Sequence, residues 1–82
     1  MEKKQVGTIS HYYGNIGVAV VELTDSMKVG DTVSIEGATT NFTQTVDSME
    51  SEHKKLEEAG SGQSIGMKVK EVVRDGDIVY LV

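Results

Sequence analysis

Short runs of β-branched and aliphatic residues, separated by glycines, dominate the chain. Nine glycines and no proline occur among 82 residues. Residues 4–13 and 16–23 flank Gly14-Asn15, two residues that tolerate positive φ, and this arrangement predicts a β-hairpin with a two-residue turn. The sequence therefore predicts a small all-β domain. Further strands are predicted at 31–36, 65–70 and 78–82.

The second arm of the predicted hairpin carries apolar residues on both of its faces. Val18 and Val20 share one face, while Ala19, Val21 and Leu23 share the other. A strand that is apolar on both faces is typical of one that is covered on both sides. We therefore expect residues 16–23 to form a central strand.

Residues 42–59 support two interpretations. Val46, Met49, His53 and Leu56 recur at spacings of three and four, and the mixture of glutamate and lysine favours a helix from about 46 to 58. In contrast, the stretch FTQTV at its start is rich in residues that favour strands.

A short repeat places Gly-Asp before two predicted strands, in VGDTVSI at 29–35 and in DGDIVYL at 75–81. The two aspartates could form a metal site or an acid/base pair. The interpretation that we prefer is a turn, in which glycine supplies the backbone conformation and aspartate accepts hydrogen bonds from nearby amides. No catalytic role is assigned to Asp31 or Asp77.

The stretch GQSIG at 62–66 matches G-x-S-x-G, the pattern around the nucleophile of many hydrolases. That turn requires a strand before the serine, a helix after it and a histidine later in the chain. Here a predicted strand follows Ser64, and both His11 and His53 precede it. The same glycines do not match a phosphate-binding loop, because Ile65 and Gly66 stand where glycine and lysine are required. We therefore predict no catalytic residue and no cofactor, and expect this chain not to be an enzyme.

Composition narrows the classes of partner. Cysteine is absent and the two histidines lie 42 positions apart, which leaves little material for a zinc site. Thirteen acidic residues against eight basic ones give a net charge of -5, which disfavours nucleic acid, and DNA is not expected. No apolar run approaches the roughly 20 residues of a membrane span. We expect one cytoplasmic domain over residues 1–82, without a membrane partner.

Three stretches together resemble a known family. They are Lys28-Val29-Gly30-Asp31 at the start of a strand, the segment from Glu58 to Gly66, and the closing Gly76-Asp77. Their order and spacing resemble the second domain of translational GTPases such as elongation factor Tu and initiation factor two. The resemblance implies a closed antiparallel β-barrel of six or seven strands. It also implies strands at about 42–51 and 53–57 in place of the helix.

The resemblance implies a non-catalytic binding module that contacts RNA, as tRNA or the ribosome, or a translation-associated protein. The GTP-binding domain is missing, so GTP binding is not expected. A Gly-Arg-Gly that often contributes to such contacts is replaced here by Gly14-Asn15-Ile16-Gly17, which lacks the arginine. Similar barrels are also appended to collagenase-like peptidases as accessory modules. The alternative function is therefore an accessory lid or specificity subunit acting in trans for a separately encoded enzyme.

The end of the first hairpin is the predicted partner site. Its two tyrosines, beside a turn with glycines, suit partner recognition or base stacking. Alternation sends Tyr12 and Tyr13 to opposite faces, so that one packs inside and the other lies outside. Both rings could also be purely structural, one capping the core and the other covering a neighbouring strand. The predicted partner-binding residues are His11, Tyr12, Tyr13, Asn15 and Ile16.

A second set of residues is predicted to contact RNA. Lys68 and Lys70 are expected on the outward face of one strand, with Arg74 just beyond its end. The alternative is that these side chains are solvated and balance neighbouring glutamates. The full set is His53, Lys54, Lys55, Lys68, Lys70 and Arg74.

Overall fold

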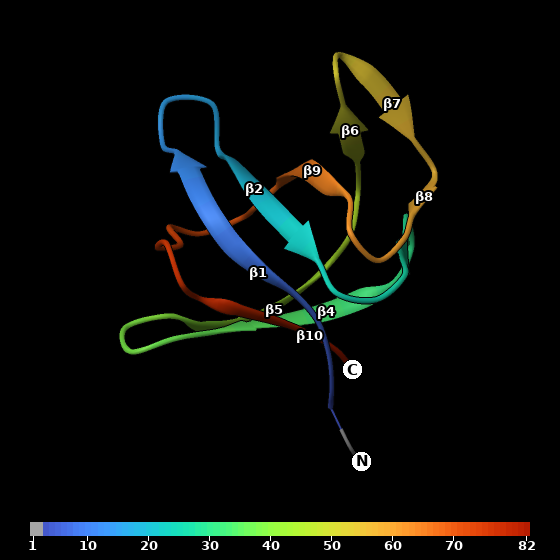
Figure 1. Cartoon of the computed structure of the whole chain (residues 1–82). Helices are drawn as coiled ribbons and strands as arrows, with labels where there is room; N and C mark the ends of the chain where they lie inside the picture. The colour runs from blue at the N-terminus through green and yellow to red at the C-terminus, as the bar shows by residue number, and fades with distance from the viewer. Residues whose placement is uncertain (1–2) are drawn as a thin grey trace.

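The computed structural model describes residues 3–82, which form ten β-strands joined by turns and loops (Figure 1). The described part of the chain contains no helix that could cross a membrane. The strands are β1 (Lys4–Tyr13), β2 (Val18–Leu23), β3 (Met27–Lys28), β4 (Thr32–Glu36), β5 (Asn41–Thr45), β6 (Met49–Ser51), β7 (Lys54–Leu56), β8 (Glu58–Ala59), β9 (Ser64–Lys68) and β10 (Ile78–Leu81).

Eight of these strands form one antiparallel sheet in the order β5-β4-β10-β1-β2-β9-β6-β7, and β3 pairs with β8 in a second sheet. β2 lies between β1 and β9, as predicted for a central strand. The β6–β7 hairpin extends at the end of the molecule opposite the start of β1 and the C-terminus (Figure 1). The all-β architecture predicted from the sequence is confirmed.

The core lies on the inner face of the curled sheet. Along β2, Ala19 and Val21 are fully buried while the intervening Val20 is only partly buried. The same alternation buries Ile65 and Met67 of β9. Removal of these aliphatic side chains from water is the main force that stabilises the domain. The largest fully buried side chains are Ile9, Met27, Ile35, Met49, Ile65 and Met67.

The predicted closed barrel of six or seven strands is not found. The recorded strand pairs among residues 3–82 end at β5 on one edge and at β7 on the other. The edge strand β5 reaches the end of β9 through one buried side chain: Gln44 Nε2 donates to the carbonyl of Lys68 at 2.8 Å, and the amide of Lys70 donates to Gln44 Oε1 at 2.9 Å. A side-chain amide therefore stands where a closed barrel has a backbone ladder.

The segment from 46 to 58 contains no helix and holds β6 and β7, joined by a turn at Glu52-His53, so the helix favoured by local propensity is wrong. The extended alternative is confirmed, but residues 46–48 divide the strand expected at 42–51 into β5 and β6. Val46 and Met49 are fully buried, which shows that core packing overrides propensity here. The first hairpin differs in its turn, which spans residues 14–17 instead of two residues. The amides of Ile16 and Gly17 both donate to the carbonyl of Tyr13.

The two Gly-Asp sequences form the same turn, as predicted. Asp31 Oδ2 accepts a hydrogen bond from the amide of Lys28 at 3.0 Å, and Asp77 Oδ2 accepts one from the amide of Arg74 at 2.9 Å. The glycine before each aspartate has a φ near +90°, at 98° in Gly30 and 90° in Gly76, where other residues are strained. The sequence repeat is therefore a repeat of turn chemistry.

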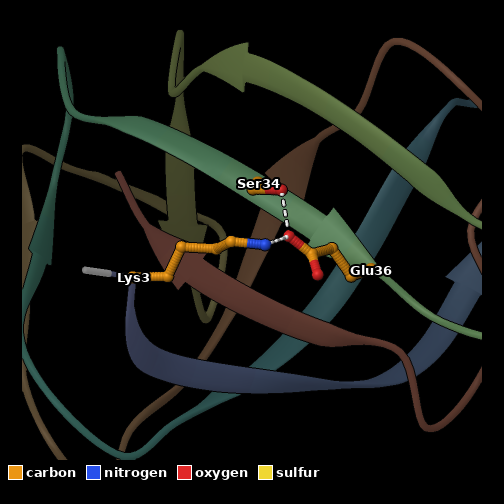
Figure 2. A network of polar contacts seen from close by, with 3 residues as sticks. All are labelled: Lys3, Ser34 and Glu36. Atoms are coloured by element: carbon orange, nitrogen blue, oxygen red, sulfur yellow. Dashed lines mark hydrogen bonds and ion pairs between the residues drawn. The ribbon is translucent and has the colours of Figure 1, made fainter. Parts of the chain in front are cut away.

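A small polar network ties the start of the chain to β4 (Figure 2). Ser34 is buried although it alternates with core residues, and its hydroxyl donates to Glu36 Oε2 at 2.8 Å. Lys3 Nζ lies 2.5 Å from the same carboxylate oxygen. The hydrogen bond from Lys3, followed by that from Ser34, holds the pKa of Glu36 below its ordinary value.

Candidate binding groove

An open groove of about 700 Å³ lies between the end of the β1–β2 hairpin and the β6–β7 hairpin, with β9 beneath them. The two hairpins stand on either side of β9 at the same end of the molecule (Figure 1). The residues that line the groove are Tyr13, Ile16, Val18, Val20, Glu50, Ser51, Glu52, His53, Gln63, Ser64, Ile65 and Gly66.

The floor of the groove is a row of residues across three strands. Val20 of β2 lies opposite Gly66 of β9, which in turn lies opposite Glu50 of β6. Directly opposed residues of antiparallel strands project to the same face, so this row points away from the core. A Cβ on Gly66 would lie 3.4 Å from Val18 Cγ1 and 3.6 Å from Glu50 Cγ, at ordinary contact distance. The missing side chain of Gly66 therefore keeps the middle of the floor open.

One wall of the groove is apolar and comes from the end of the first hairpin. Tyr13 is 48% exposed and Ile16, in the four-residue turn, is 62% exposed. The Tyr13 ring is braced by His11, whose ring centroid lies 4.4 Å away at an interplanar angle of 60°. Large exposed apolar side chains on a wall of a groove are typical of a binding surface.

The opposite wall is polar and comes from the β6–β7 hairpin. Its two-residue turn has positive φ at both central positions, 51° at Glu52 and 65° at His53. Such turns favour Asn-Gly or Gly-Gly, and other residues in left-handed conformations cost about 1–3 kcal/mol each. The turn holds the side chains of Glu52 and His53 at the rim of the groove.

The groove contains two carboxylates that lack ion pairs in the described structure. The ion pairs recorded for residues 3–82 join Lys3 to Glu36 and Lys4 to Asp25, outside the groove. Glu50 lies opposite Lys55 in the β6–β7 register. Together with Lys68, these two residues also line an adjoining hollow of about 180 Å³. Glu52, at the tip of the hairpin, faces the larger groove.

The structure divides the predicted partner-binding residues between surface and core. Tyr13 and Ile16 line the groove, and His11 stacks against Tyr13. Tyr12 packs against the core, so the two tyrosines occupy opposite faces as alternation predicts. Asn15 is exposed in the turn. Their role in binding a partner stays a prediction.

The predicted RNA-contacting residues do not line one cavity. His53 lines the groove, and Lys55 and Lys68 line the adjoining hollow. Lys70 lies beyond the end of β9, which ends at Lys68, so the two lysines do not share a strand face as expected. Lys54 and Arg74 also lie outside both cavities. Contact with RNA stays a prediction for all six residues.

Ser64, His53 and Glu52 all line the groove, which places the residue types of a hydrolytic triad on one surface. A nucleophile and its base must come within hydrogen-bonding reach, and a third group must orient the base. The side-chain hydrogen bond recorded at Ser64 within residues 3–82 joins its carbonyl to the Ser51 hydroxyl at 3.4 Å. The absence of a catalytic role for Ser64 stays a prediction.

Sequence reasoning missed the floor of the groove. Val18 and Val20 were expected to lie beneath a second layer of protein, but this face of β2 is open to the groove and both valines are only partly buried. The apolar residues on both faces of β2 are the pattern that could have indicated a binding surface. Gly66 and Glu50 were not identifiable, because the pairing of β9 with β2 and β6 is not evident from the sequence.

Comparison with known proteins gives a consistent family. Residues 2–79 match the model described as the peptidase family U32 C-terminal domain. The chain is 40% identical over 80 residues to an uncharacterized protease of Methanocaldococcus jannaschii, covering 96% of this chain and 20% of that protein. It is 36% identical over 81 residues to a collagenase of Porphyromonas gingivalis, covering 96% of this chain and 22% of that protein. The chain thus spans about a fifth of the length of these relatives.

Solved structures agree on the fold. The C-terminal domain of a candidate U32 peptidase from Geobacillus thermoleovorans superposes with a TM-score of 0.91 at 24% identity, covering 96% of this chain and 92% of that chain. Its selenomethionine variant gives a TM-score of 0.89 at 25% identity, covering 93% of this chain and 96% of that chain.

These matches overturn the resemblance to the second domain of elongation factor Tu and initiation factor two. The stretches that carried it include Gly30-Asp31 and Gly76-Asp77, which form turns. Turns of this kind serve any small β-domain and do not identify a family.

Proposed function

Because this chain belongs to the peptidase family U32 C-terminal domain family, we propose that it is a non-catalytic accessory module of a U32-type peptidase. In this proposal the groove binds a peptide. A catalytic part that lies elsewhere acts on the bound peptide. The module would work as a lid or specificity element, either in trans or joined to the catalytic part.

The observation that carries this proposal is that this chain matches only a small part of each longer relative. The matched region accounts for 96% of this chain but about a fifth of relatives named as a protease and as a collagenase. Most of the length of those relatives is therefore free to hold the catalytic residues. A binding groove without a linked nucleophile and base fits the part that remains.

The expectation of a translation partner rested on the resemblance to translational GTPases, which the U32 family match overturns. The expected cytoplasmic location stays a prediction. RNA contact by the basic residues also stays a separate prediction.

The proposal can be tested on the Porphyromonas gingivalis collagenase from which the region matching this chain has been removed. Hydrolysis of a fluorogenic collagen-sequence peptide is measured for the truncated enzyme alone, with this chain added, and with this chain fused in place of the missing region. We expect truncation to raise KM, fusion to restore it in part, and the isolated chain to hydrolyse nothing.

Two controls accompany this measurement, one for catalysis by Ser64 and one for folding. The Ser64→Ala variant of the fusion should keep the kcat of the unchanged fusion, because Ser64 is proposed as lining of the groove and not as nucleophile. Melting curves of each fusion establish that the added domain is folded. If truncation raises KM and a folded fusion does not lower it again, this chain is not such a module. Hydrolysis that disappears in the Ser64→Ala variant would also refute the proposal.

A further inference from the structure

We propose that the groove binds an arginine or lysine side chain of an extended peptide segment. The aliphatic stem of that side chain would lie on the apolar wall, and its cationic end would lie at the glutamates of the polar wall. This inference rests on the proposed function and names the class of substrate or partner that the accessory module selects.

The apolar wall has the shape and chemistry for the stem of a long basic side chain. Tyr13 and Ile16 expose 48% and 62% of their surfaces, and Val18 continues the wall into the floor. Lysine and arginine cover apolar surface with their methylene groups while the charge remains solvated.

The polar wall has the charge for the cationic end. Glu50 and Glu52 both line the groove, and neither takes part in the ion pairs recorded for residues 3–82. Glu50 has Lys55 opposite it across the β6–β7 pair, so its field is partly offset, whereas Glu52 stands at the tip of the hairpin. A guanidinium can meet carboxylate oxygens with two parallel hydrogen bonds, which favours arginine over lysine.

The floor explains why an extended segment is favoured. Gly66 leaves the centre of the floor without a side chain, in a row with Val20 and Glu50 that crosses β2, β9 and β6. A peptide backbone can therefore approach the sheet closely at this point. The same carboxylates oppose a phosphate backbone in the groove, within a chain whose net charge is -5. Charge complementarity thus favours a basic peptide over RNA at this site.

A chemical-shift titration of the ¹⁵N-labelled chain tests the inference. The probes are a capped heptapeptide of glycine, serine and leucine with one central arginine, and the same peptide with citrulline, which has nearly the same shape without the charge. We expect shifts at the amides of Ile16, His53 and Gly66. We also expect the arginine peptide to bind about two- to fivefold more tightly at low salt, the range given by exposed ion pairs.

Three variants locate the effect. Glu52→Gln should remove most of the preference for arginine over citrulline, whereas Glu71→Gln, which makes the same charge change at an exposed residue outside the groove, should preserve it. Gly66→Val should abolish binding of both peptides by filling the floor. The φ of Gly66 is not positive and a Cβ there would make ordinary contacts, so the backbone at this position accepts a side chain. A melting curve of the Gly66→Val variant then separates a loss of binding from a loss of folding.

The outcomes distinguish this inference from the proposed function. Equal affinity for arginine and citrulline peptides, or a preference that persists in Glu52→Gln, overturns the cation site. Groove shifts caused by a short oligouridylate but not by the arginine peptide overturn it in favour of RNA. If neither peptide binds but fusion of the chain still lowers KM of the truncated collagenase, the cation site is wrong and the accessory function stands.

Discussion

Replacing Gly37 with alanine should destabilise the domain strongly, because Asp77 occupies the space that the new methyl group needs. A Cβ at Gly37 would overlap Oδ1 of Asp77 and lie 2.6 Å from its Cγ. Asp77 is 4% exposed and cannot simply swing into solvent. Its other oxygen accepts the Arg74 amide at 2.9 Å, and its carbonyl accepts the Ile9 amide at 2.8 Å.

The size of the effect follows from what Asp77 must give up. To make room, its carboxylate must rotate and lose the hydrogen bond from the Arg74 amide. Hydrogen bonds to charged groups contribute about 1.5–3 kcal/mol, and a buried amide left unsatisfied adds to the cost. We therefore expect Gly37→Ala to lower the free energy of unfolding by about 2–3 kcal/mol. In a domain of this size that corresponds to a fall in Tm of roughly 10–20 °C.

Urea denaturation of a double-mutant cycle gives a direct measurement. In an Asp77→Ala background the overlap is gone, so Gly37→Ala should cost almost nothing or stabilise by about 0.4–1 kcal/mol through the unfolded state. Gly60→Ala is the matched control, since the nearest atom to its Cβ would be 3.8 Å away. A loss below about 0.5 kcal/mol for Gly37→Ala, or additivity with Asp77→Ala, would contradict the reasoning.

Three other outcomes are expected. Tyr12→Ala should lower stability by about 2–3 kcal/mol because its ring packs against the core, whereas Tyr13→Ala should melt normally and weaken peptide binding; melting and peptide titration of both variants check this. Acidification should destabilise the domain, because lysine hydrogen bonds lower the folded-state pKa values of Glu36 and Asp25 from 4.5 and 3.8. Their contribution is fully present above those values and is lost as pH falls through the lower folded-state values, so melting between pH 7 and 2.5 should show a smaller loss in Glu36→Gln. If the basic residues contact RNA, Lys68→Ala should weaken tRNA binding and its salt dependence, and no binding by the unchanged chain at low salt removes RNA as a partner.

Alternation along the chain predicts β4 and β9, because a strand with one buried face must alternate, whereas the two-residue strands β3 and β8 are too short to show it. Val33 and Ile35 in β4, and Ile65 and Met67 in β9, are buried as this rule requires. The rule fails for 46–58, where helical spacing competes with extended structure. There the extended conformation is stabilised by the burial of Val46 and Met49, which depends on partners elsewhere in the chain.

The remaining features depend on contacts that sequence patterns do not encode. The β6–β7 turn at Glu52-His53 has left-handed φ values without the glycine or asparagine that usually marks such a turn. The sheet edge at β5 is completed by the Gln44 side chain, which a barrel prediction cannot anticipate. Sequence analysis named Tyr13 and Ile16 of one wall and His53 of the other, but it could not bring the two walls together, because that requires the pairing of β6 with β9.

Fold and binding are specified by alternate residues of the same strands. In β2, Ala19 and Val21 face the core while Val18 and Val20 face the groove, and in β9 Gly66 lies between the buried Ile65 and Met67. Because neighbouring residues of a strand project to opposite faces, the groove-facing positions can change with little cost to the core. A solved domain that shares only 24% identity yet superposes with a TM-score of 0.91 shows that this fold tolerates wide changes of sequence. Under the proposed function, the groove-facing positions of β2 and β9 are therefore the ones at which specificity can change without loss of the fold.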